Sequence, residues 1–159
     1  MNIVNTGNEL PLMESFYTLQ GEGFHKGLAA FFIRIGGCNI GCHWCDVKDS
    51  WDSKIYPQID IKEIVKKAKT HSKVAVITGG EPLMWPMGPL TKKLQDSGIS
   101  THLETSGAYP LSGQWNWICL SPKKNKLPNR EFYKFADELK IIVYNKSDFS
   151  FAKLQSKKV

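Results

Sequence analysis

The sequence lacks any apolar run near the ~20 residues that a membrane-spanning helix needs. Its N-terminal segment, residues 1–16, has neither the basic start nor the apolar stretch of a secretory signal peptide. Internal repeats, low-complexity tracts and long linkers are also absent. We therefore expect a cytoplasmic protein with no membrane partner, and a length of 159 residues favours a single domain over 1–159.

Cysteine is scarce, but its placement is uneven. Of the four cysteines, three fall within the segment 38–45 and Cys119 stands apart. In a reducing compartment, such a tight group indicates a metal or redox site rather than a disulfide framework. Cys119 lies in the apolar run WICL, so we expect a buried core thiol there.

Acidic residues are fewer than basic ones, 15 against 21, which gives a net charge of +6. The excess lysines are spread over several segments, and scattered lysines are typical of a solvated surface rather than a nucleic-acid footprint. We therefore expect no nucleic-acid partner. Anionic small-molecule substrates are a better use for some of these charges.

The sequence alternates predicted strands and helices. Strands are expected at 29–35, 73–78, 100–104, 117–120 and 139–144, and helices at 61–70, capped by Asp60, at 89–97, stopped by Gly98, and at about 147–155, capped by Ser147 and Asp148. This alternation predicts an α/β fold with a parallel sheet of βα units. Five strands are too few for a closed eight-stranded barrel, so a partial (β/α) barrel is the better description.

Polar or glycine-rich segments follow four of the expected strands. They read GGCNIGCHWCD, TGGEP, ETSG and SPKK in chain order. Ligands of such sheets collect at the carboxyl ends of the strands. We therefore expect these four segments to meet at one site.

The cysteines form a C-x3-C-x2-C motif on Cys38, Cys42 and Cys45. Three thiolates can hold three irons of a [4Fe–4S] cluster and leave the fourth iron open. That iron can bind the amino and carboxylate groups of S-adenosylmethionine, whose one-electron cleavage yields a 5′-deoxyadenosyl radical. Two alternatives stay open: zinc held with His43 or His25, although no second cysteine pair exists, and three unliganded buried thiols.

The segment CNIGCHWC, with aromatic Trp44 before the last cysteine, resembles the radical S-adenosylmethionine (SAM) superfamily. Within it, the segment 15–23 (SFYTLQGEG) and the strand residues Phe32-Ile33-Arg34 are similar to the 7-carboxy-7-deazaguanine synthases of deazapurine (queuosine) biosynthesis. The similarity runs from about Leu12 to the end of the chain. TGGEP alone indicates only the superfamily.

The resemblance implies a set of residues that contact SAM. Backbone around Cys45 would meet the adenine, and glycines would let the chain approach the methionine amino group. Without the resemblance, these segments also fit a tight turn, a water-facing glutamate and a surface lysine. The implied contacts are Trp44, Cys45, Asp46, Gly79, Gly80, Glu81, Glu104, Ser106, Ser121, Pro122 and Lys123.

The resemblance also implies the substrate 6-carboxy-5,6,7,8-tetrahydropterin, whose ring contracts with loss of ammonia while SAM is regenerated. Leu19, Gln20 and Gly21 would bind the pterin edge, and Glu22 and Thr78 its ring nitrogens. Arg34 would bind the substrate carboxylate, since an arginine among apolar strand residues needs a partner; Glu14 or Glu22 are the alternatives. A flavodoxin or ferredoxin as electron donor and a homodimer are implied as well.

The sequence departs from the family pattern at two places. Val47 stands where the family usually has a threonine whose hydroxyl binds Mg²⁺, so Mg²⁺ would have to rely on Asp46, substrate and water. The chain also ends at Val159, before a strand that the family usually has, so we expect a shortened or truncated barrel.

Two other functions share the cysteine spacing. One is a small activase of a glycyl-radical enzyme, and the other is an iron–sulfur or zinc module without enzymatic activity. The SFYTLQGEG segment and Arg34 favour the deazaguanine synthase reading over both.

Overall fold

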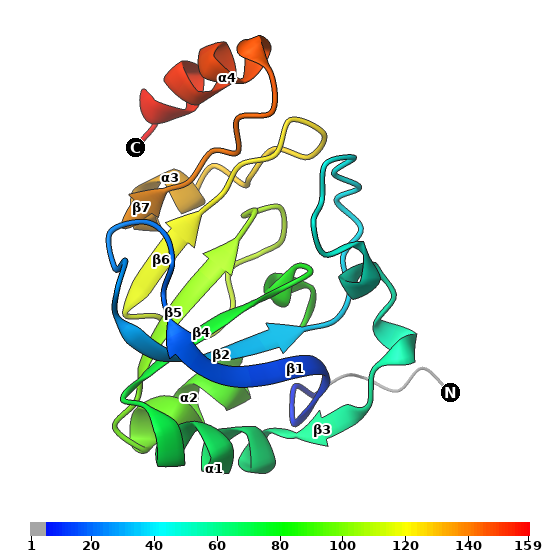
Figure 1. Ribbon diagram of the computed structural model, residues 1–159, viewed down its shortest axis with the longest axis vertical. Helices are drawn as coiled ribbons and strands as arrows, with labels where there is room; N and C mark the ends of the chain where they lie inside the picture. The colour runs from blue at the N-terminus through cyan, green and yellow to red at the C-terminus, as the bar shows by residue number, and fades with distance from the viewer. Residues whose placement is uncertain (1–5) are drawn as a thin grey trace.

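The computed structural model describes residues 6–159, so the first five residues of the segment inspected for a signal peptide lie outside it. Within the described residues, the centre of the molecule is one sheet of seven strands (Figure 1). The strands β2, β4, β5, β6 and β7 run parallel, whereas β1 is antiparallel to β2 and β3. In order across the sheet they are β3 (Gln58–Asp60), β1 (Glu9–Leu19), β2 (Ala29–Ile35), β4 (Val74–Gly79), β5 (Ser100–Thr105), β6 (Trp117–Leu120) and β7 (Glu138–Leu139). The expected open, partial-barrel α/β fold is confirmed.

Three of the four helices in the described residues match predicted ones, whereas α3 (Phe132–Phe135) was not predicted. The other three are α1 (Ile61–His71), α2 (Gly88–Asp96) and α4 (Lys146–Ser156), with short 3₁₀ turns η1 (Lys48–Trp51), η2 (Ser53–Ile55) and η3 (Pro82–Met84). The side chain of Asp60 accepts a hydrogen bond from the Lys62 amide, which confirms the predicted cap of α1. None of the helices within 6–159 is long and apolar enough to cross a bilayer.

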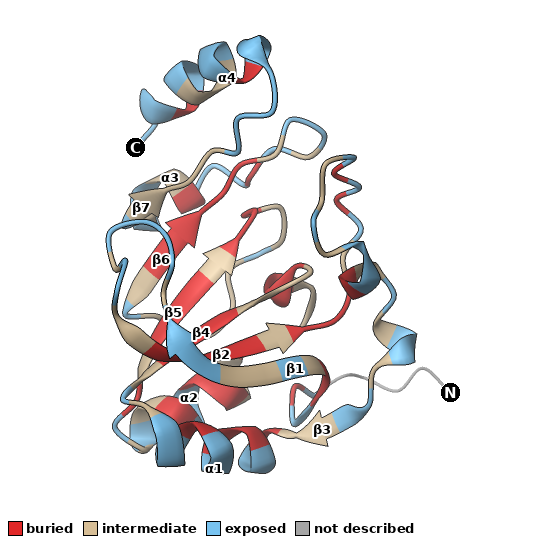
Figure 2. Ribbon diagram, viewed as in Figure 1, coloured by how far each residue is buried: buried red, intermediate tan, exposed pale blue. Residues whose placement is uncertain are grey.

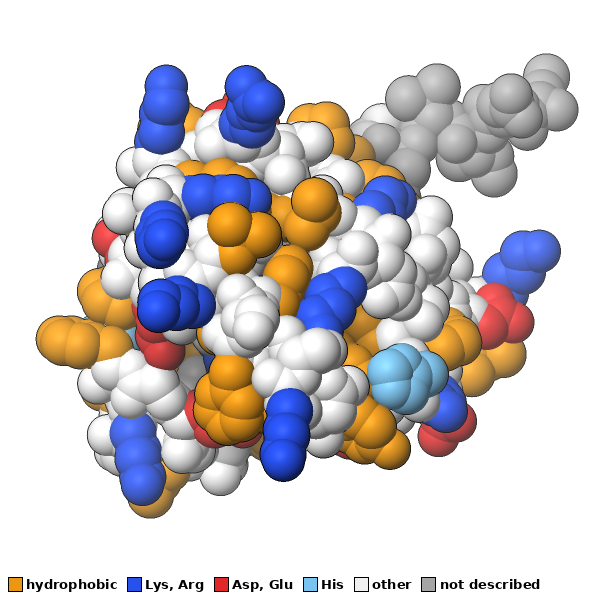
Figure 3. All heavy atoms as spheres, turned by 90° about the horizontal axis from the view of Figure 1, so that it is seen from above, with side chains coloured by type: hydrophobic (Ala, Val, Ile, Leu, Met, Phe, Trp, Pro, Cys, Tyr) orange, Lys and Arg blue, Asp and Glu red, His pale blue; other side chains and the backbone are white. Residues whose placement is uncertain are grey.

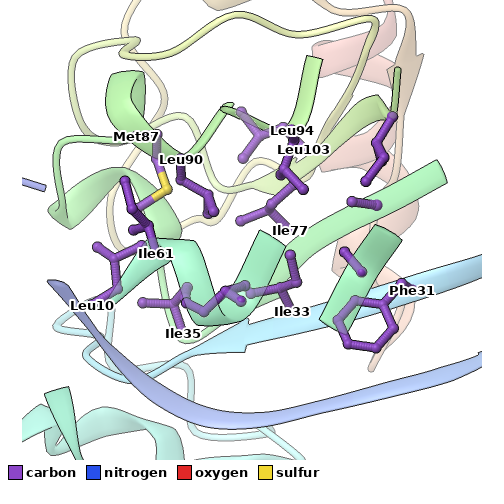
Figure 4. Packing of buried hydrophobic residues seen from close by; sticks show 14 of the residues in the cluster. Leu10, Phe31, Ile33, Ile35, Ile61, Ile77, Met87, Leu90, Leu94 and Leu103 are labelled. Carbon is purple, nitrogen blue, oxygen red and sulfur yellow. The ribbon is translucent and has the colours of Figure 1, made fainter. Parts of the chain in front are cut away.

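The main core lies between the sheet and the helices α1 and α2 (Figures 2 and 4). Alternation along each strand decides which side chains enter it. Ile33 and Ile35 of β2 are fully buried in this core, whereas Phe32 belongs to a second cluster with Ala30 and Val76. The face of the sheet opposite α1 and α2 is therefore lined by the other half of each strand, and it carries the candidate site.

Three sequence expectations need correction. β1 and β3 were not predicted as strands. The expected strand at 139–144 pairs only over β7, because β6 ends at Leu120 and the following Ser121-Pro122 supplies no further ladder partner. The N-cap of α4 is Asn145, not Ser147 or Asp148; Asp148 completes its capping box.

Candidate active site

A cavity of about 430 Å³ opens at the carboxyl ends of the parallel strands. The segments that follow β2, β4, β5 and β6 all line it, together with residues at the end of β1, as the strand alternation predicted. Of the residues that the resemblance assigned to cluster, cofactor or substrate, only Pro122 is absent from the lining, and it is buried. The lining includes Leu19, Gln20, Gly21, Glu22, Arg34, Cys38, Cys42, Trp44, Cys45, Asp46, Thr78, Gly79, Gly80, Glu81, Glu104, Ser106, Ser121 and Lys123.

The chain at the end of β4, around Gly79 and Gly80, holds the base of the cysteine loop, residues 38–45. Gly80 N–H donates to the Ile35 carbonyl at 2.9 Å, and Glu81 N–H donates to the Gly37 carbonyl at 2.8 Å. A Cβ on Gly80 would lie 2.3 Å from the Gly37 oxygen and 2.9 Å from Cys38 Cβ. Glycine at position 80 is therefore required by the protein's own chain, which is a different reason from close approach to a ligand.

The three cysteines of the motif all line the cavity as free thiols. Burial raises the pKa of the Cys38 and Cys42 thiols. In the part of the chain that the structure describes, no three His, Cys, Asp or Glu side chains converge to hold a single metal ion. A cluster takes one thiolate per iron, so it does not need such convergence, and the all-thiol donor set suits it.

The two histidines that a zinc site would use lie outside the cavity lining. The His43 ring contacts Tyr144 edge-on, with 5.2 Å between ring centroids. The His25 ring packs on Trp117 at 4.4 Å and on His102 at 4.7 Å. Each histidine ring is thus held in aromatic contacts outside the cavity that the three cysteines line.

Glu81 is buried and its carboxylate is satisfied by the protein. It accepts hydrogen bonds from the amides of Leu83 at 3.1 Å and Ser106 at 2.9 Å, and from the hydroxyls of Thr105 and Ser106. These bonds tie the turn after β4 to the turn after β5. The resemblance assigned Glu81 and Ser106 to cofactor contact; in this structure their side chains bind each other.

Glu104 is the centre of a polar network on the cavity wall. Its carboxylate accepts hydrogen bonds from Gln20 Nε2 at 3.0 Å, Thr78 Oγ1 at 3.4 Å and Lys140 Nζ at 3.2 Å. Lys140 Nζ also lies 3.2 Å from Glu22. The structure therefore brings together Glu104, expected to touch cofactor, and three residues expected to touch substrate.

Lys140 is a cavity residue that the sequence reasoning missed. It follows β7, in the run LKIIVY, and it is the single charge there, much as Arg34 is in AAFFIRI. This single charge in an apolar run was the sequence signal that could have identified Lys140 as a site residue. Burial disfavours the charge on Lys140, but the carboxylates of Glu104 and Glu22 outweigh it, and the pKa of Lys140 is raised.

Lys123 is the second lysine of the cavity. Its Nζ donates to Ser121 Oγ and lies 5.3 Å from the centre of the Trp44 ring. Burial lowers the pKa of Lys123, because few charges compensate for its desolvation. Its amino group thus lies in the cavity beside Trp44 of the cysteine loop.

Arg34 has a protein partner in this structure. Its Nε donates to Glu14 at 2.6 Å, while the side chain still lines the cavity. Of the two alternatives left open by the sequence, Glu14 is therefore the partner, and Glu22 pairs with Lys140 instead.

The segment next to Cys45 does not suit a magnesium site. The Val47 side chain has no oxygen, although the residue lines the cavity, and the nearby Ser50 hydroxyl donates to the Val47 carbonyl at 2.6 Å. Asp46 is the only carboxylate that this segment, 44–47, turns toward the cavity. One carboxylate does not make a protein-built site for an ion that prefers six oxygen ligands.

The radical SAM superfamily matches residues 32–115, which run from β2 past β5. A protein of Flavobacterium psychrophilum named 7-carboxy-7-deazaguanine synthase is 58% identical over 156 residues, which cover 98% of this chain and 74% of that protein. The chain belongs to the 7-carboxy-7-deazaguanine synthase family of the radical SAM superfamily.

Further relatives agree with this assignment. A Synechocystis protein of the same name is 49% identical over 150 residues, covering 94% of this chain and 72% of its own length. The crystal structure of QueE from Escherichia coli superposes with a TM-score of 0.85 at 28% identity, over 100% of this chain and 84% of that one.

Membership of the superfamily implies a [4Fe–4S] cluster and SAM, and hence a reductant. The cavity is consistent with both groups: three thiols line it, and its volume lies within the usual range for small-molecule sites, about 300–1,000 Å³. Besides Lys140, the lining residues that sequence reasoning missed include Thr105, Ser50, Trp51 and Ile142.

Proposed function

We propose that this chain converts 6-carboxy-5,6,7,8-tetrahydropterin into 7-carboxy-7-deazaguanine, with loss of ammonia, in queuosine and deazapurine biosynthesis. The observation that carries the proposal is one cavity in which the three thiols of the cysteine loop face the network around Glu104. The names of the relatives supply the reaction.

In this proposal, Cys38, Cys42 and Cys45 hold the cluster. SAM lies along the Gly79-Gly80 turn and the backbone of 44–46, with Ser121 and Lys123 beside it and Pro122 shaping their turn. When bound, cluster and SAM together supply a radical that removes a hydrogen atom from carbon. Lys123 brings a positive charge toward the carboxylate of SAM, and Glu81 and Ser106 keep the two turns together.

The substrate lies against the Glu104 side of the cavity. Leu19, Gln20 and Gly21 bind the pterin edge, and Glu22 and Thr78 reach its ring nitrogens. Arg34 uses Nε for Glu14, so its terminal nitrogens stay available for the substrate carboxylate. These residues orient the ring and exclude water, and the bound cofactor supplies the reactivity.

Reconstituted protein incubated with SAM, reductant and 6-carboxytetrahydropterin tests the function. Formation of 7-carboxy-7-deazaguanine is the expected result. If a cluster-loaded protein releases only 5′-deoxyadenosine, the substrate assignment is wrong, and an activase of a protein substrate becomes the better explanation. A protein with tightly bound zinc and no labile sulfide would overturn the cluster.

The remaining parts of the proposal concern context. We propose that residues 1–159 form one radical SAM domain, that the enzyme acts in the cytoplasm as a homodimer, and that flavodoxin or ferredoxin reduces it. The family resemblance supports these statements. Light scattering of the loaded protein tests the dimer directly.

A further inference from the structure

A lysine-rich loop lies against the cysteine loop. Asn125 Nδ2 donates to the carbonyls of Ile40 at 3.2 Å and Gly41 at 2.9 Å. Lys126 Nζ donates to Asn39 Oδ1 at 3.3 Å. The loop 123–126 therefore holds one side of the cysteine loop by hydrogen bonds, and Gly41 of the cysteine loop stays exposed.

The surface around this exposed edge is basic with an apolar centre. Tyr144 is 65% exposed and packs against His43 of the cysteine loop, and Leu127 is 53% exposed. We call Lys124, Lys126 and Lys146 the basic rim. Figure 3 shows lysine and hydrophobic side chains intermixed on the face seen from above, over the end of the molecule where α4 lies.

The rim keeps most of its positive charge. Lys124 is paired with Asp148, but the ion pairs found within residues 6–159 include neither Lys126 nor Lys146. Lys126 instead lies 4.2 Å from the centre of the Tyr109 ring and bonds the neutral Asn39. Asp46 is an exposed acidic residue of the neighbouring segment.

We propose that the basic rim and Tyr144 form the docking surface for an acidic one-electron carrier protein. This inference rests on the proposed function, because it requires a cluster on the cysteine loop. One electron would leave the reduced carrier, which is oxidised, and enter the cluster, which is reduced; no atom is transferred. Complementary charge steers such encounters, and a small apolar centre suits the limited area of transient redox complexes.

The test compares two double variants that change the net charge equally. Lys126→Glu with Lys146→Glu reverses the charge of two of the three lysines of the basic rim. Lys66→Glu with Lys67→Glu reverses two exposed lysines on α1, which covers the other face of the sheet. Each reconstituted protein is mixed rapidly with reduced flavodoxin at low ionic strength, and loss of the cluster absorbance is followed in time. Parallel reactions use dithionite, a small reductant that needs no docking surface.

We expect the rim variant to be reduced by flavodoxin at least about tenfold more slowly than the original protein, with a weaker dependence on salt. Its reduction by dithionite and the behaviour of the α1 variant should be unchanged. Equal flavodoxin rates in the rim variant and the original protein would overturn the docking surface, as would an equal loss in the α1 variant. Slow reduction of Lys126→Glu/Lys146→Glu by dithionite would indicate that the cysteine loop is damaged. In that case the milder double variant Lys126→Gln/Lys146→Gln is measured instead. If both flavodoxin and dithionite reduce that variant at the rates of the original protein, the proposal is overturned. If the original protein holds no reducible cluster, both the docking surface and the proposed function are wrong.

Discussion

Lys140 Nζ and Thr78 Oγ1 approach the same oxygen of Glu104, at 3.2 Å and 3.4 Å. Thr78 belongs to β4, Glu104 to β5, and Lys140 follows β7, so this carboxylate joins separate parts of the sheet. Because the side chains of Lys140 and Glu104 are only 23% and 21% exposed, the pair is partly shielded from screening by salt. Lys140 thereby holds the Glu104 carboxylate in one orientation in the cavity.

Replacing Lys140 by Met should lower kcat/KM for the pterin by about 10- to 100-fold, because a partly buried carboxylate loses its counter-charge. Lys140→Arg should recover much of that loss. Lys92→Met is the control: it removes an exposed ion pair with Asp96 and should leave kcat/KM unchanged. Steady-state kinetics with iron content measured in each variant provide the check; a Lys140→Met enzyme with unchanged kcat and KM would contradict the role given to this pair.

Replacing Gly80 by Ala should disrupt the cysteine loop, because the new Cβ would meet the Gly37 carbonyl and Cys38. We expect less iron and sulfide per chain after reconstitution, and a lower urea midpoint. Gly88→Ala is the matched control, since nothing lies within 4 Å of the Cβ that it would add at the start of α2. Full cluster occupancy in Gly80→Ala would show that the turn can move aside.

Local sequence signals predicted β2, β4, β5, β6 and α1 well, because a buried strand such as AAFFIRI or KVAVIT is bounded by glycines on the chain itself. Because the carboxyl ends of parallel strands lie at one edge of the sheet, the four polar segments that follow these strands were expected to meet at one site. β1 was missed, since Pro11 and the polar residues Glu14 and Ser15 interrupt its apolar residues, and its pairing with β2 and β3 is decided by tertiary contacts.

The partners of the charged residues could not be predicted from sequence. Arg34 with Glu14 follows from the antiparallel register of β1 and β2, in which these two residues face each other. Lys140 with Glu104 joins residues from separate strands, and nothing along the chain specifies it. Similarly, the need for glycine at position 80 depends on Gly37 and Cys38, which arrive from another strand end.

Adding Mg²⁺ to chelator-treated enzyme should change turnover by less than about twofold, because Val47 supplies no oxygen ligand and the Ser50 hydroxyl is already bonded. Val47→Thr would restore a hydroxyl beside Asp46 and should introduce a clear stimulation by Mg²⁺. Val47→Ala serves as the control for the change of size. A large stimulation of the original enzyme would mean that substrate and water complete the site without position 47.

His102 should make the unloaded protein sensitive to mild acid. Burial, followed by the neighbouring His25, lowers the pKa of His102 to about 4, although Asp137 acts in the opposite direction. His102 is 8% exposed, so the neutral form of its imidazole is favoured in the folded protein. In the unfolded chain the pKa is about 6.5, so the unfolded state binds more protons below that value and stability falls as the pH decreases from 6.5 toward 4.

Between pH 7.5 and pH 5 this residue should reduce the free energy of unfolding by about 2 kcal/mol. His102→Gln cannot take up that proton, so its stability should depend less on pH by the same amount. Urea unfolding of both proteins at the two pH values gives the comparison, in which the titration of all other groups cancels. His25 lowers the pKa of His102, so His25→Gln should raise that pKa toward its unfolded value and make the loss of stability between pH 7.5 and pH 5 smaller. Equal pH dependence in the original protein and His102→Gln would show that His102 accepts a proton in the folded state without cost.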